Sequence, residues 1–418
     1  MARVFQFRVS ASAVLPFCCG LLAIASAPLA AQEPIAGERP GATARLSASD
    51  GSVLKSPEAR KTLPCTVTPA KPELGFDLRF HAGYEATVPL KELAGDGDQL
   101  TTIFRVIPEG HPAAATYFAQ HVPVPSLDDL DRGSATLTGA FDVGKGKYHI
   151  DWLMRDGGEH VCSFHWDAEA ALAPHDRQIA LDIAAGAVLP FDAETFRSAP
   201  PVVRDQGNSP LHVKVIVNFA PQNAAAASLQ PAEIGALVSI LRRIDRDPRI
   251  ARFSLVVFNL QQQKVLYRQE GAPEIDFPAL GRALRSLNLG TTDLQRLAQK
   301  HEGAEFLDRL IVAEVGDVDD NPDAVVFAGP KLRIEEPIPA AALKQLNGVK
   351  FPVFYMSYNL NPAAIPWRDT IGIAVKYLKG MEFSISRPRD VYFAWNGIAG
   401  RIGTGRQGAT VAGNAPSH

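Results

Sequence analysis

The sequence predicts two domains of different fold class, an antiparallel β-sandwich followed by a doubly wound α/β domain. In the first domain, apolar residues alternate with polar ones, as at Tyr148, Ile150 and Trp152. A period of two is typical of strands that bury a single face. In the second domain, apolar runs such as residues 253–260 alternate with amphipathic segments. That pattern is typical of a mostly parallel sheet covered by helices on both faces.

A secretory signal peptide is predicted over residues 1–31. Two arginines precede an apolar run that extends to residue 29, and the small residues before Gln32 suit cleavage there. A retained anchor and a lipid anchor on Cys18 or Cys19 are the alternatives, but the residues before Cys18 lack the small pair of a lipoprotein signal. We therefore expect a secreted or periplasmic protein whose mature chain has no membrane span.

Charge and cysteine content of the mature chain follow from this cleavage. Residues 1–31 contain two arginines and no acidic residue, so their removal changes the formal charge from −3 to −5. A mildly acidic chain is a poor partner for nucleic acid, and none is expected. Cys65 and Cys162 remain, and in an exported protein we expect them to form a disulfide worth about 4 kcal/mol. Two buried thiols are the alternative.

Three segments are predicted to lack regular structure. Residues 32–62 are expected to be a disordered leader, residues 192–208 a linker and residues 403–418 a disordered tail. All three are rich in Gly, Pro, Ala, Ser or charged residues and have no apolar periodicity. The folded domains are therefore expected to span residues 63–191 and 209–402.

The first domain is expected to contain about seven short strands separated by turn residues. Residues 156–159 are predicted to form a hairpin turn, because their two glycines accept positive φ. This turn places Cys162 on the inward face together with Phe164 and Trp166. The number and length of the strands resemble an immunoglobulin-like sandwich in outline, although the Cys, Trp and Cys signature of antibody domains is absent.

Histidines are concentrated in the same domain, which holds seven of the ten. His149 and His165 fall on the polar face of one predicted hairpin, where they would be diagonal neighbours. No spacing between the histidines matches a zinc motif, and solvent-facing positions on strands explain the pattern. No metal site is therefore expected in the sandwich.

The second domain is expected to begin with a buried strand at residues 212–220 and a helix at residues 231–247. Pro231 suits the first turn of that helix, and Pro248 ends it. Asp276, Thr292 and Asp369 are predicted to cap later helices. The remaining elements are expected at residues 253–260, 264–268 (an antiparallel edge strand), 276–287, 292–310, 323–329, 351–358, 369–378, 382–385 and 386–398.

This succession of strands and helices resembles a von Willebrand factor type A domain over residues 208–402. The resemblance rests on the segments HVKVIVNFA, FSLVVFNLQQQKVLYR, LNLGTTDLQ and DAVVFAG. It implies a divalent-cation site at the C-terminal edge of the sheet. Members of the family form that site from a D-x-S-x-S loop, a threonine in a second loop and an aspartate after a later strand.

Two of these three loops lack the expected carboxylates. Hard cations need oxygen ligands, among which carboxylates contribute the charge. We therefore expect no metal ion and no cofactor, and we interpret the corresponding positions as a degenerate adhesion site and possible binding edge. These positions hold Asn218, Ala220 and Gln222 in the first loop, Thr291 and Thr292 in the second, and Ala328 in the third.

Motifs for other chemistry are missing or incomplete. The chain has no G-x-S-x-G elbow and no phosphate-binding loop, and the helix near His301 carries Glu305 where a zinc protease needs its second histidine. The acidic residues 317–323 begin like a calcium loop, but Pro322 replaces the required glycine. A solvated loop is the expected structure there, and a loose calcium site is the alternative.

Together these features favour a secreted or periplasmic protein that binds or scaffolds an unidentified protein partner and has no catalytic residues. Two alternatives remain open. One is cation-dependent adhesion through unusual ligands such as Asn218, Thr291, Asp293 or the acidic loop. The other is an extracellular hydrolase, which would need a concave site that no local motif reveals.

Overall fold

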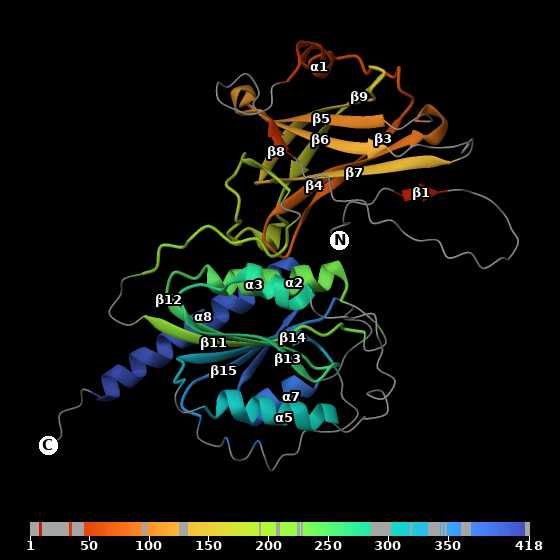
Figure 1. Cartoon of the computed structure of the whole chain (residues 1–418). Coiled ribbons are helices and arrows are strands. Elements are labelled where there is room, and N and C mark those ends of the chain that lie inside the picture. Colours follow the sequence, from red (N-terminus) through yellow and green to blue (C-terminus); the bar gives the residue numbers. More distant parts are fainter. Residues whose placement is uncertain are drawn as a thin grey trace, which may run out of the picture. The chain divides into compact units, whose positions relative to one another are not determined.

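The chain divides into two compact units, Met1–Ala193 and Glu194–His418. Figure 1 shows their elements in a computed structural model. The structure describes residues 8–10, 33–35, 46–93, 98–124, 133–191, 194–205, 210–223, 226, 229–285, 302–317, 320–332, 343, 346, 349–360 and 369–413.

Seven main strands form two antiparallel sheets in the first unit. They are β3 (Thr66–Leu74), β4 (Phe80–Pro89), β5 (Asp98–Pro108), β6 (Thr116–Val124), β7 (Ser134–Val143), β8 (Gly146–Arg155) and β9 (Val161–Ala170). One sheet has the order β3-β4-β7 and the other the order β6-β5-β8-β9. The short strands β1 (Arg8–Ser10) and β10 (Val188–Pro190) pair with β7, and β2 (Glu33–Ile35) pairs with β6. β1 lies in the segment expected to be a signal peptide, which stays a prediction.

The alternation in the sequence places one face of each sheet in a shared core. Tyr148, Ile150 and Trp152 are all buried, as their spacing predicted. Aromatic rings fill much of this core: the Tyr84 ring packs edge-on against Trp152 and Phe104, with centroid distances of 5.3 and 5.7 Å. Each edge-to-face pair adds about 1 kcal/mol beyond the burial of its area. An antiparallel, sandwich-like fold is therefore confirmed for this unit.

The predicted disulfide is present in the first unit. Cys65, just before β3, is bonded to Cys162 in β9, and the two Cα atoms are 6.2 Å apart. Cys162 is fully buried, and Phe164 and Trp166 pack against the same core. The bond therefore links the residue that precedes the first main strand of this unit to its last main strand.

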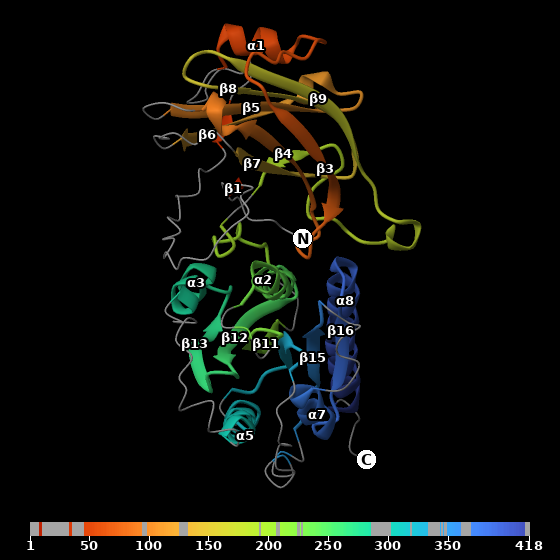
Figure 2. The same ribbon diagram turned by 90° about the vertical axis from the view of Figure 1, so that its right-hand side faces the viewer.

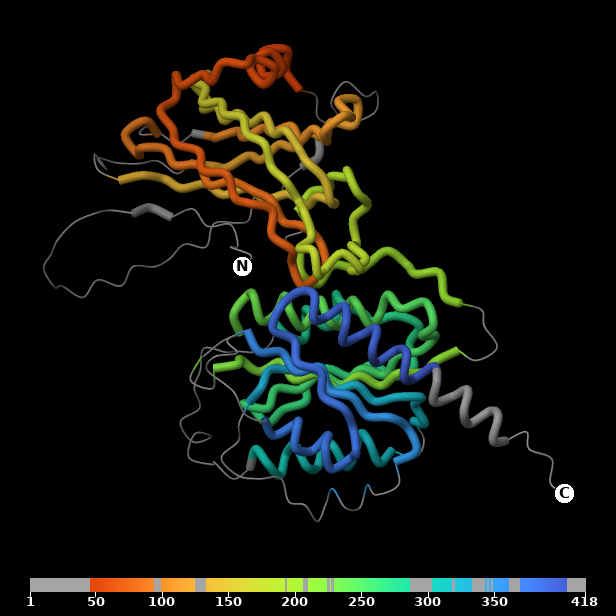
Figure 3. The backbone as a smooth tube through the Cα atoms, turned by 180° about the vertical axis from the view of Figure 1, so that it is seen from behind, coloured from red at the N-terminus to blue at the C-terminus, as the bar shows by residue number. Residues whose placement is uncertain are grey.

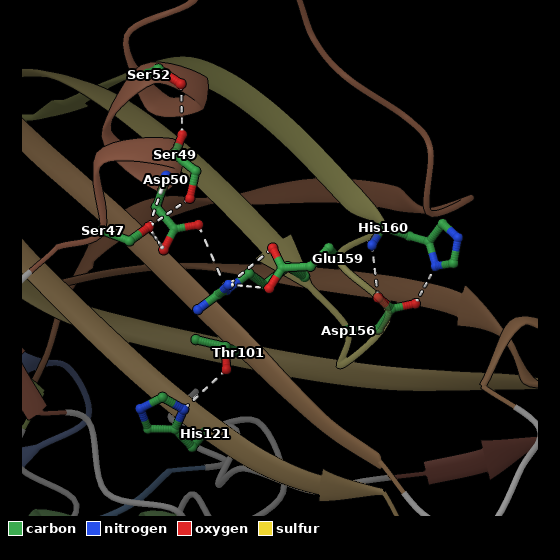
Figure 4. Close-up of polar contacts among 10 residues, drawn as sticks. Ser47, Ser49, Asp50, Ser52, Thr101, His121, Asp156, Glu159 and His160 are labelled. Carbon is green, nitrogen blue, oxygen red and sulfur yellow. Dashed lines mark hydrogen bonds and ion pairs between the residues drawn. The ribbon is translucent and has the colours of Figure 1, made fainter.

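The expected disordered leader contains a helix, α1 (Ala48–Leu54), so that prediction was wrong for residues 46–62. Val53 and Leu54 pack on a small apolar cluster on the outer side of β5 and β8. Asp50 lies 3.6 Å from Arg155, which also pairs with Glu159 of the β8–β9 turn (Figure 4). A seven-residue helix is too short to show periodicity, and the apolar patch that it covers comes from distant strands.

The second unit contains a six-stranded sheet and five described helices of seven or more residues. The strands are β11 (Leu211–Asn218), β12 (Ile250–Asn259), β13 (Lys264–Ala272), β14 (Ala324–Pro330), β15 (Val353–Tyr358) and β16 (Met381–Ile385). The helices are α2 (Pro231–Asp245), α3 (Phe277–Arg285), α5 (Glu302–Val315), α7 (Thr370–Tyr377) and α8 (Pro388–Gly413).

The strand order in this sheet is β13-β12-β11-β14-β15-β16. Every neighbouring pair is parallel except β12–β13, which is antiparallel as predicted. α2 and α3 cover one face, with α8 beside α2, and α5 and α7 cover the other (Figures 1 and 2). All eight residues of β11 are buried, because this central strand is covered on both sides.

Helix ends in the second unit follow the predicted signals. Pro231 is the first residue of α2. Asp276 Oδ1 accepts from the Ala279 N–H at the start of α3, at 2.8 Å. Asp369 Oδ1 accepts from the Gly372 N–H at the start of α7, at 2.9 Å. The predicted cap Thr292 lies outside the described residues.

Two predicted boundaries were wrong. Residues 194–205 of the expected linker belong to the second unit, where Arg204 Nη1 donates to the carbonyl oxygens of Asp245 and Asp247 at 2.6 and 3.0 Å. The last carbonyl groups of a helix have no donor within the helix, and Arg204 supplies one at the end of α2. α8 continues to Gly413, beyond the expected start of the tail at residue 403. Even so, none of the described helices is both long and apolar enough to cross a membrane.

Candidate functional site

The C-terminal ends of β11, β14 and β15 meet at one edge of the sheet, where the sequence predicted a binding edge. Asn218 ends β11 and is fully buried. Its Oδ1 accepts a hydrogen bond from the Leu260 N–H at 3.0 Å. A Cβ on Gly329, the neighbouring position in β14, would lie 2.9 Å from the Asn218 Cβ, so only glycine leaves room there. These contacts hold the Asn218 amide in one orientation.

The Asn218 Nδ2 group has no hydrogen-bond partner within the described part of the chain. An amide nitrogen is a donor and cannot coordinate a cation. The aspartate that the family resemblance implied at this position would offer a second oxygen instead. The side chain therefore presents a polar group at this edge without the charge that attracts a dication.

Gln222, another predicted position, is locked into a network of amide hydrogen bonds. Its Nε2 donates to Asn359 Oδ1 at 2.6 Å, and its Oε1 accepts from the Leu360 N–H at 3.0 Å. The Gln222 N–H donates to Glu233 Oε1 at 2.6 Å. The other Glu233 oxygen accepts from the Gln230 N–H at 2.7 Å. The network joins the loop after β11 to the loop after β15 and to the start of α2.

The other predicted positions contribute no ligand atoms from their side chains. Ala220 and Ala328 are buried alanines, and Ala328 pairs with Val217 next to Asn218. Thr291 and Thr292 lie outside the described residues. The structure thus brings Asn218, Ala220 and Ala328 together at one edge, next to Gln222, and their side chains offer amide groups but no carboxylate.

A second polar cluster at the same edge was not predicted. The Tyr355 hydroxyl donates to Asp369 Oδ2 at 2.6 Å. The Ser357 hydroxyl donates to Glu382 Oε1 at 2.9 Å, and Lys331 Nζ lies 3.2 Å from the same oxygen. Sequence reasoning identified Asp369 as a helix cap but gave no sign that β15 would bury it. Glu382, unlike Asp369, is paired with a cation of the chain, Lys331.

Burial changes the acidity of Asp369. It raises the pKa of this carboxyl to about 6, although the hydrogen bonds from Tyr355 and Gly372 act in the opposite direction. The nearby Glu382 carboxylate adds to the increase. Asp369 is almost inaccessible to solvent, so it is poorly placed to bind an ion from solution.

The acidic loop at residues 317–323 already holds a cation of the chain. Lys214 of β11 is buried, and its Nζ lies 2.9 Å from Asp320 Oδ2 and 3.1 Å from Glu314 Oε2. Burial disfavours the charged lysine, but the contacts with Asp320 and Glu314 outweigh it and hold the pKa of Lys214 above its ordinary value. Asp317 lies 3.8 Å from the same nitrogen. The ammonium therefore lies close to three described carboxylates, those of Glu314, Asp317 and Asp320.

A serine, a histidine and an aspartate also meet near this loop, but not as a catalytic triad. His212 Nε2 lies 2.9 Å from Ser254 Oγ and 3.3 Å from Asp320 Oδ1. In a triad the carboxylate binds the other ring nitrogen, so that it orients the base. Here His212 Nδ1 faces Arg252 at 3.4 Å, and both His212 and Ser254 are buried. This arrangement does not activate a nucleophile.

Asp77, His81 and Asp142 in the sandwich have the geometry of a possible metal site. His81 Nδ1 lies 2.7 Å from Asp142 Oδ1, and Nε2 lies 3.1 Å from Asp77 Oδ1. Burial alone would lower the pKa of His81, but the hydrogen bonds to both carboxylates outweigh it and raise that pKa to about 10. The imidazolium, with Arg79 at 3.5 Å from Asp142, neutralises the pair. A metal ion would have to displace a tightly held proton.

The predicted neighbours His149 and His165 do lie side by side on the outer face of the β8–β9 hairpin. Their ring centroids are 6.3 Å apart. His149 Nδ1 lies 2.7 Å from Asp167 Oδ1, and Nε2 lies 3.2 Å from Asp151 Oδ1. Both nitrogens of this ring are engaged with carboxylates, which fits the expected surface role.

Comparisons with known proteins give no family. No protein-family model and no curated protein matches the chain. Among solved structures it is similar to the PilB minor pilin from Streptococcus sanguinis, with 8% identity over 72% of this chain and 87% of the pilin and a TM-score of 0.29.

Two hydrolase structures are similar at a still lower level. The first is a glycosyl hydrolase family 2 member from Bacteroides cellulosilyticus, with 10% identity over 76% of this chain and 38% of that chain. The second is Bacteroides uniformis β-glucuronidase 2, with 10% identity over 75% and 38%. Both have a TM-score of 0.19, and this chain spans well under half of their length. Similarity this low carries no argument about fold or function.

Replacing Lys214 by methionine tests the ion network at the acidic loop. Lys214→Met takes the ammonium away from the buried Glu314 carboxylate, which keeps its contact with Arg268, and from the partly exposed Asp320 carboxylate. We expect a loss of about 3–5 kcal/mol in the free energy of unfolding, measured by urea denaturation near neutral pH. The matched change Lys264→Met, at an exposed position of β13, should alter stability by less than about 0.5 kcal/mol. If the two variants were equally stable, the ion pairs of Lys214 with Glu314 and Asp320 would not contribute to the stability of the fold.

Replacing Asp369 by asparagine tests the cost of the buried carboxylate. The folded-state pKa of Asp369 lies above the unfolded value, so its ionisation lowers stability as pH rises through about 6. Asparagine keeps the cap on α7 without the charge. Asp369→Asn should therefore raise the free energy of unfolding by about 1–3 kcal/mol near pH 7.5, with little gain near pH 4.

Asp390→Asn at the start of α8 is the matched control for this change. Asp390 Oδ2 accepts from the Ser386 and Arg387 N–H groups at 2.9 and 2.8 Å, in a part-exposed position. No stabilisation is expected there. A pH-independent effect of Asp369→Asn, or a loss of stability near pH 7.5, would show that its ionised form is not disfavoured in the fold.

Proposed function

We propose that the chain is an exported, non-catalytic recognition protein. Its second unit is a von Willebrand factor A-like domain that binds a protein partner at the C-terminal edge of its sheet without a metal ion. Its first unit is an immunoglobulin-like sandwich. The disulfide between Cys65 and Cys162 supports export, because such bonds persist in oxidising compartments.

The strand order supports the A-like assignment of the second unit. The resemblance in sequence implied a strand, a helix, a second strand with an antiparallel edge partner, and then helix–strand repeats. The order β13-β12-β11-β14-β15-β16, with β13 antiparallel at the edge, agrees with that plan. In doubly wound sheets of this kind, ligands bind at the C-terminal ends of the strands.

The first unit has two features in common with immunoglobulin-like sandwiches. Its sheets β3-β4-β7 and β6-β5-β8-β9 distribute seven strands as three plus four. The Tyr148 hydroxyl, at the start of β8, donates to the Gly144 carbonyl oxygen at 2.7 Å. A buried tyrosine that bonds back to the backbone at this place is a known feature of such folds. Modules of this kind commonly present loops to other proteins.

The observation that carries the metal-free proposal is the amide network at the binding edge. Asn218 replaces the first carboxylate, and Gln222 and Asn359 bond to each other through their amides. The side-chain oxygens of these three amides each accept a hydrogen bond within the chain and carry no charge, so they attract a hard cation weakly. Among the described residues, the carboxylates nearest to this edge accept backbone N–H groups, as Glu233 does, or pair with a lysine, as Glu382 does.

Capture of the partner in the presence of chelator tests this proposal. The immobilised full-length chain is incubated with the extracellular or periplasmic fraction of the producing cell, with excess EDTA or with magnesium and calcium, and retained proteins are quantified by mass spectrometry. The same protein should be retained to the same extent in both conditions. Asn223→Arg, at an exposed position beside Gln222, should weaken retention by at least about ten-fold.

Asn396→Arg is the matched control, because Asn396 is exposed on α8, away from the C-terminal edge. It should leave retention unchanged. Retention that disappears in EDTA and returns with magnesium would favour the cation-dependent alternative. Retention that resists Asn223→Arg would place the binding surface elsewhere.

A further inference from the structure

The edge strand β16 and its two flanking helices carry most of the exposed large apolar side chains of the described chain. Six such residues are at least one-third exposed, and four of them lie between positions 373 and 393. They are Ile373 (36% exposed), Tyr377 (49%), Met381 (39%) and Phe393 (37%). An exposed apolar cluster of this kind marks an interaction site more often than scattered single residues do.

The four residues lie on β16 and on the two helices that precede and follow it in the chain. Ile373 and Tyr377 are four residues apart on α7, so they face the same side of that helix. Met381 is the first residue of β16, and Phe393 lies on α8. Figures 2 and 3 show the chain passing from α7 into β16 and on into α8. Exposed apolar side chains therefore lie on β16 itself and on both helices that adjoin it in the chain.

The outer edge of β16 has backbone groups available for another strand. β16 ends the sheet order and, among the described strands, pairs with β15 alone. The Ile385 carbonyl oxygen accepts from the Asn359 N–H at 2.8 Å, so the backbone groups of Ile385 point toward β15. Because these directions alternate along a strand, the N–H and C=O groups of Glu382 and Ser384 point outward.

The opposite edge of the sheet is protected in a way that β16 is not. In β13 the exposed side chains are Lys264, Arg268 and Glu270, which are charged and discourage strand addition. In β16 the exposed side chains are Met381 and Ser384. Its one charged residue, Glu382, is turned inward to Ser357 and Lys331.

The charged residues around β16 indicate what kind of strand could pair with its outer edge. Residues 376–389 contain four basic residues and one acidic residue, in a chain whose formal net charge is −3. Lys376 and Lys379 are exposed before the strand, and Arg387 is exposed after it. Pairing of β16 with the same strand of a second copy would bring these like charges together. An extended segment with acidic residues at its ends complements them.

We propose that β16 is a docking edge for an extended, acidic segment of another protein, which adds to the sheet as a seventh strand. Main-chain hydrogen bonds to Glu382 and Ser384 supply affinity, and alternate apolar side chains of the segment contact the exposed apolar residues of β16, α7 and α8. This surface is separate from the C-terminal edge and does not depend on the function proposed for it.

Selection from a displayed library of random dodecapeptides on the purified full-length chain tests the proposal. The selected peptides should alternate apolar residues and carry an excess of Asp and Glu. The strongest peptide is then synthesised with a fluorescent label, and its affinity is measured by anisotropy. Methylation of alternate backbone nitrogens on one edge of this peptide should weaken binding by at least about ten-fold, since it removes donors to the strand.

Variants of the chain identify the surface. Ser384→Pro removes an outward N–H but keeps the ladder to β15, so it should weaken binding at least about ten-fold, whereas Ser384→Ala should not. The combined change Lys376→Glu and Arg387→Glu should weaken binding to a similar degree without unfolding the protein. Ile373→Ser, at an exposed position, provides an independent loss of apolar contact if Ser384→Pro proves unstable.

Three results would overturn the proposal. The first is binding of the selected peptides to Ser384→Pro and Ile373→Ser as tight as their binding to the unchanged chain. The second is a net positive charge on the selected peptides. The third is a dimer of the unchanged chain that Ser384→Pro converts to a monomer, which would make a second copy the occupant.

Discussion

Local neutralisation of buried carboxylates is the constraint on which the second unit depends. An unpaired carboxylate in a covered sheet would cost several kcal/mol, so each must find a cation or N–H donors nearby. Lys214 on the central strand and Arg268 on β13 meet this need for the buried Glu314, and lysines also pair with two partly buried carboxylates, Lys214 with Asp320 and Lys331 with Glu382. The protein therefore holds its acidic groups together with its own cations, which leaves little negative potential to attract a dication.

The two surfaces proposed for recognition are two different edges of the same sheet. At the C-terminal edge, strands end in amide side chains whose hydrogen bonds fix loops to one another. At the lateral edge, β16 is the last strand and lacks the charged residues that protect β13. The first surface is polar and closely hydrogen-bonded, whereas the second offers the backbone groups of an edge strand that has exposed apolar residues on it and on its adjoining helices. The two would therefore select partners of different chemistry.

Much of the fold was predictable from the sequence, because it depends on local periodicity. The continuous apolar run of β11 predicted a central strand, the antiparallel edge followed from the short turn before Lys264, and two cysteines predicted one bond. The pairing of Lys214 with Glu314 was not predictable, since one hundred positions separate the partners and neither stands out in its own segment. The helix α1 was missed for a similar reason, because its support comes from distant strands.

At the candidate site, the sequence located Asn218 and Ala328 at one edge but not the residues that complete it. Asn359, which bonds Gln222 across 137 positions, carries no signal of its own. Electron paramagnetic resonance of manganese(II) added to the purified chain in equimolar amount tests the central claim directly. The six-line spectrum of the free ion should keep its full intensity, because Glu233 and Asp369 are held by hydrogen bonds within the chain and Glu382 by Lys331. Loss of that signal, with its recovery on addition of magnesium, would contradict the account.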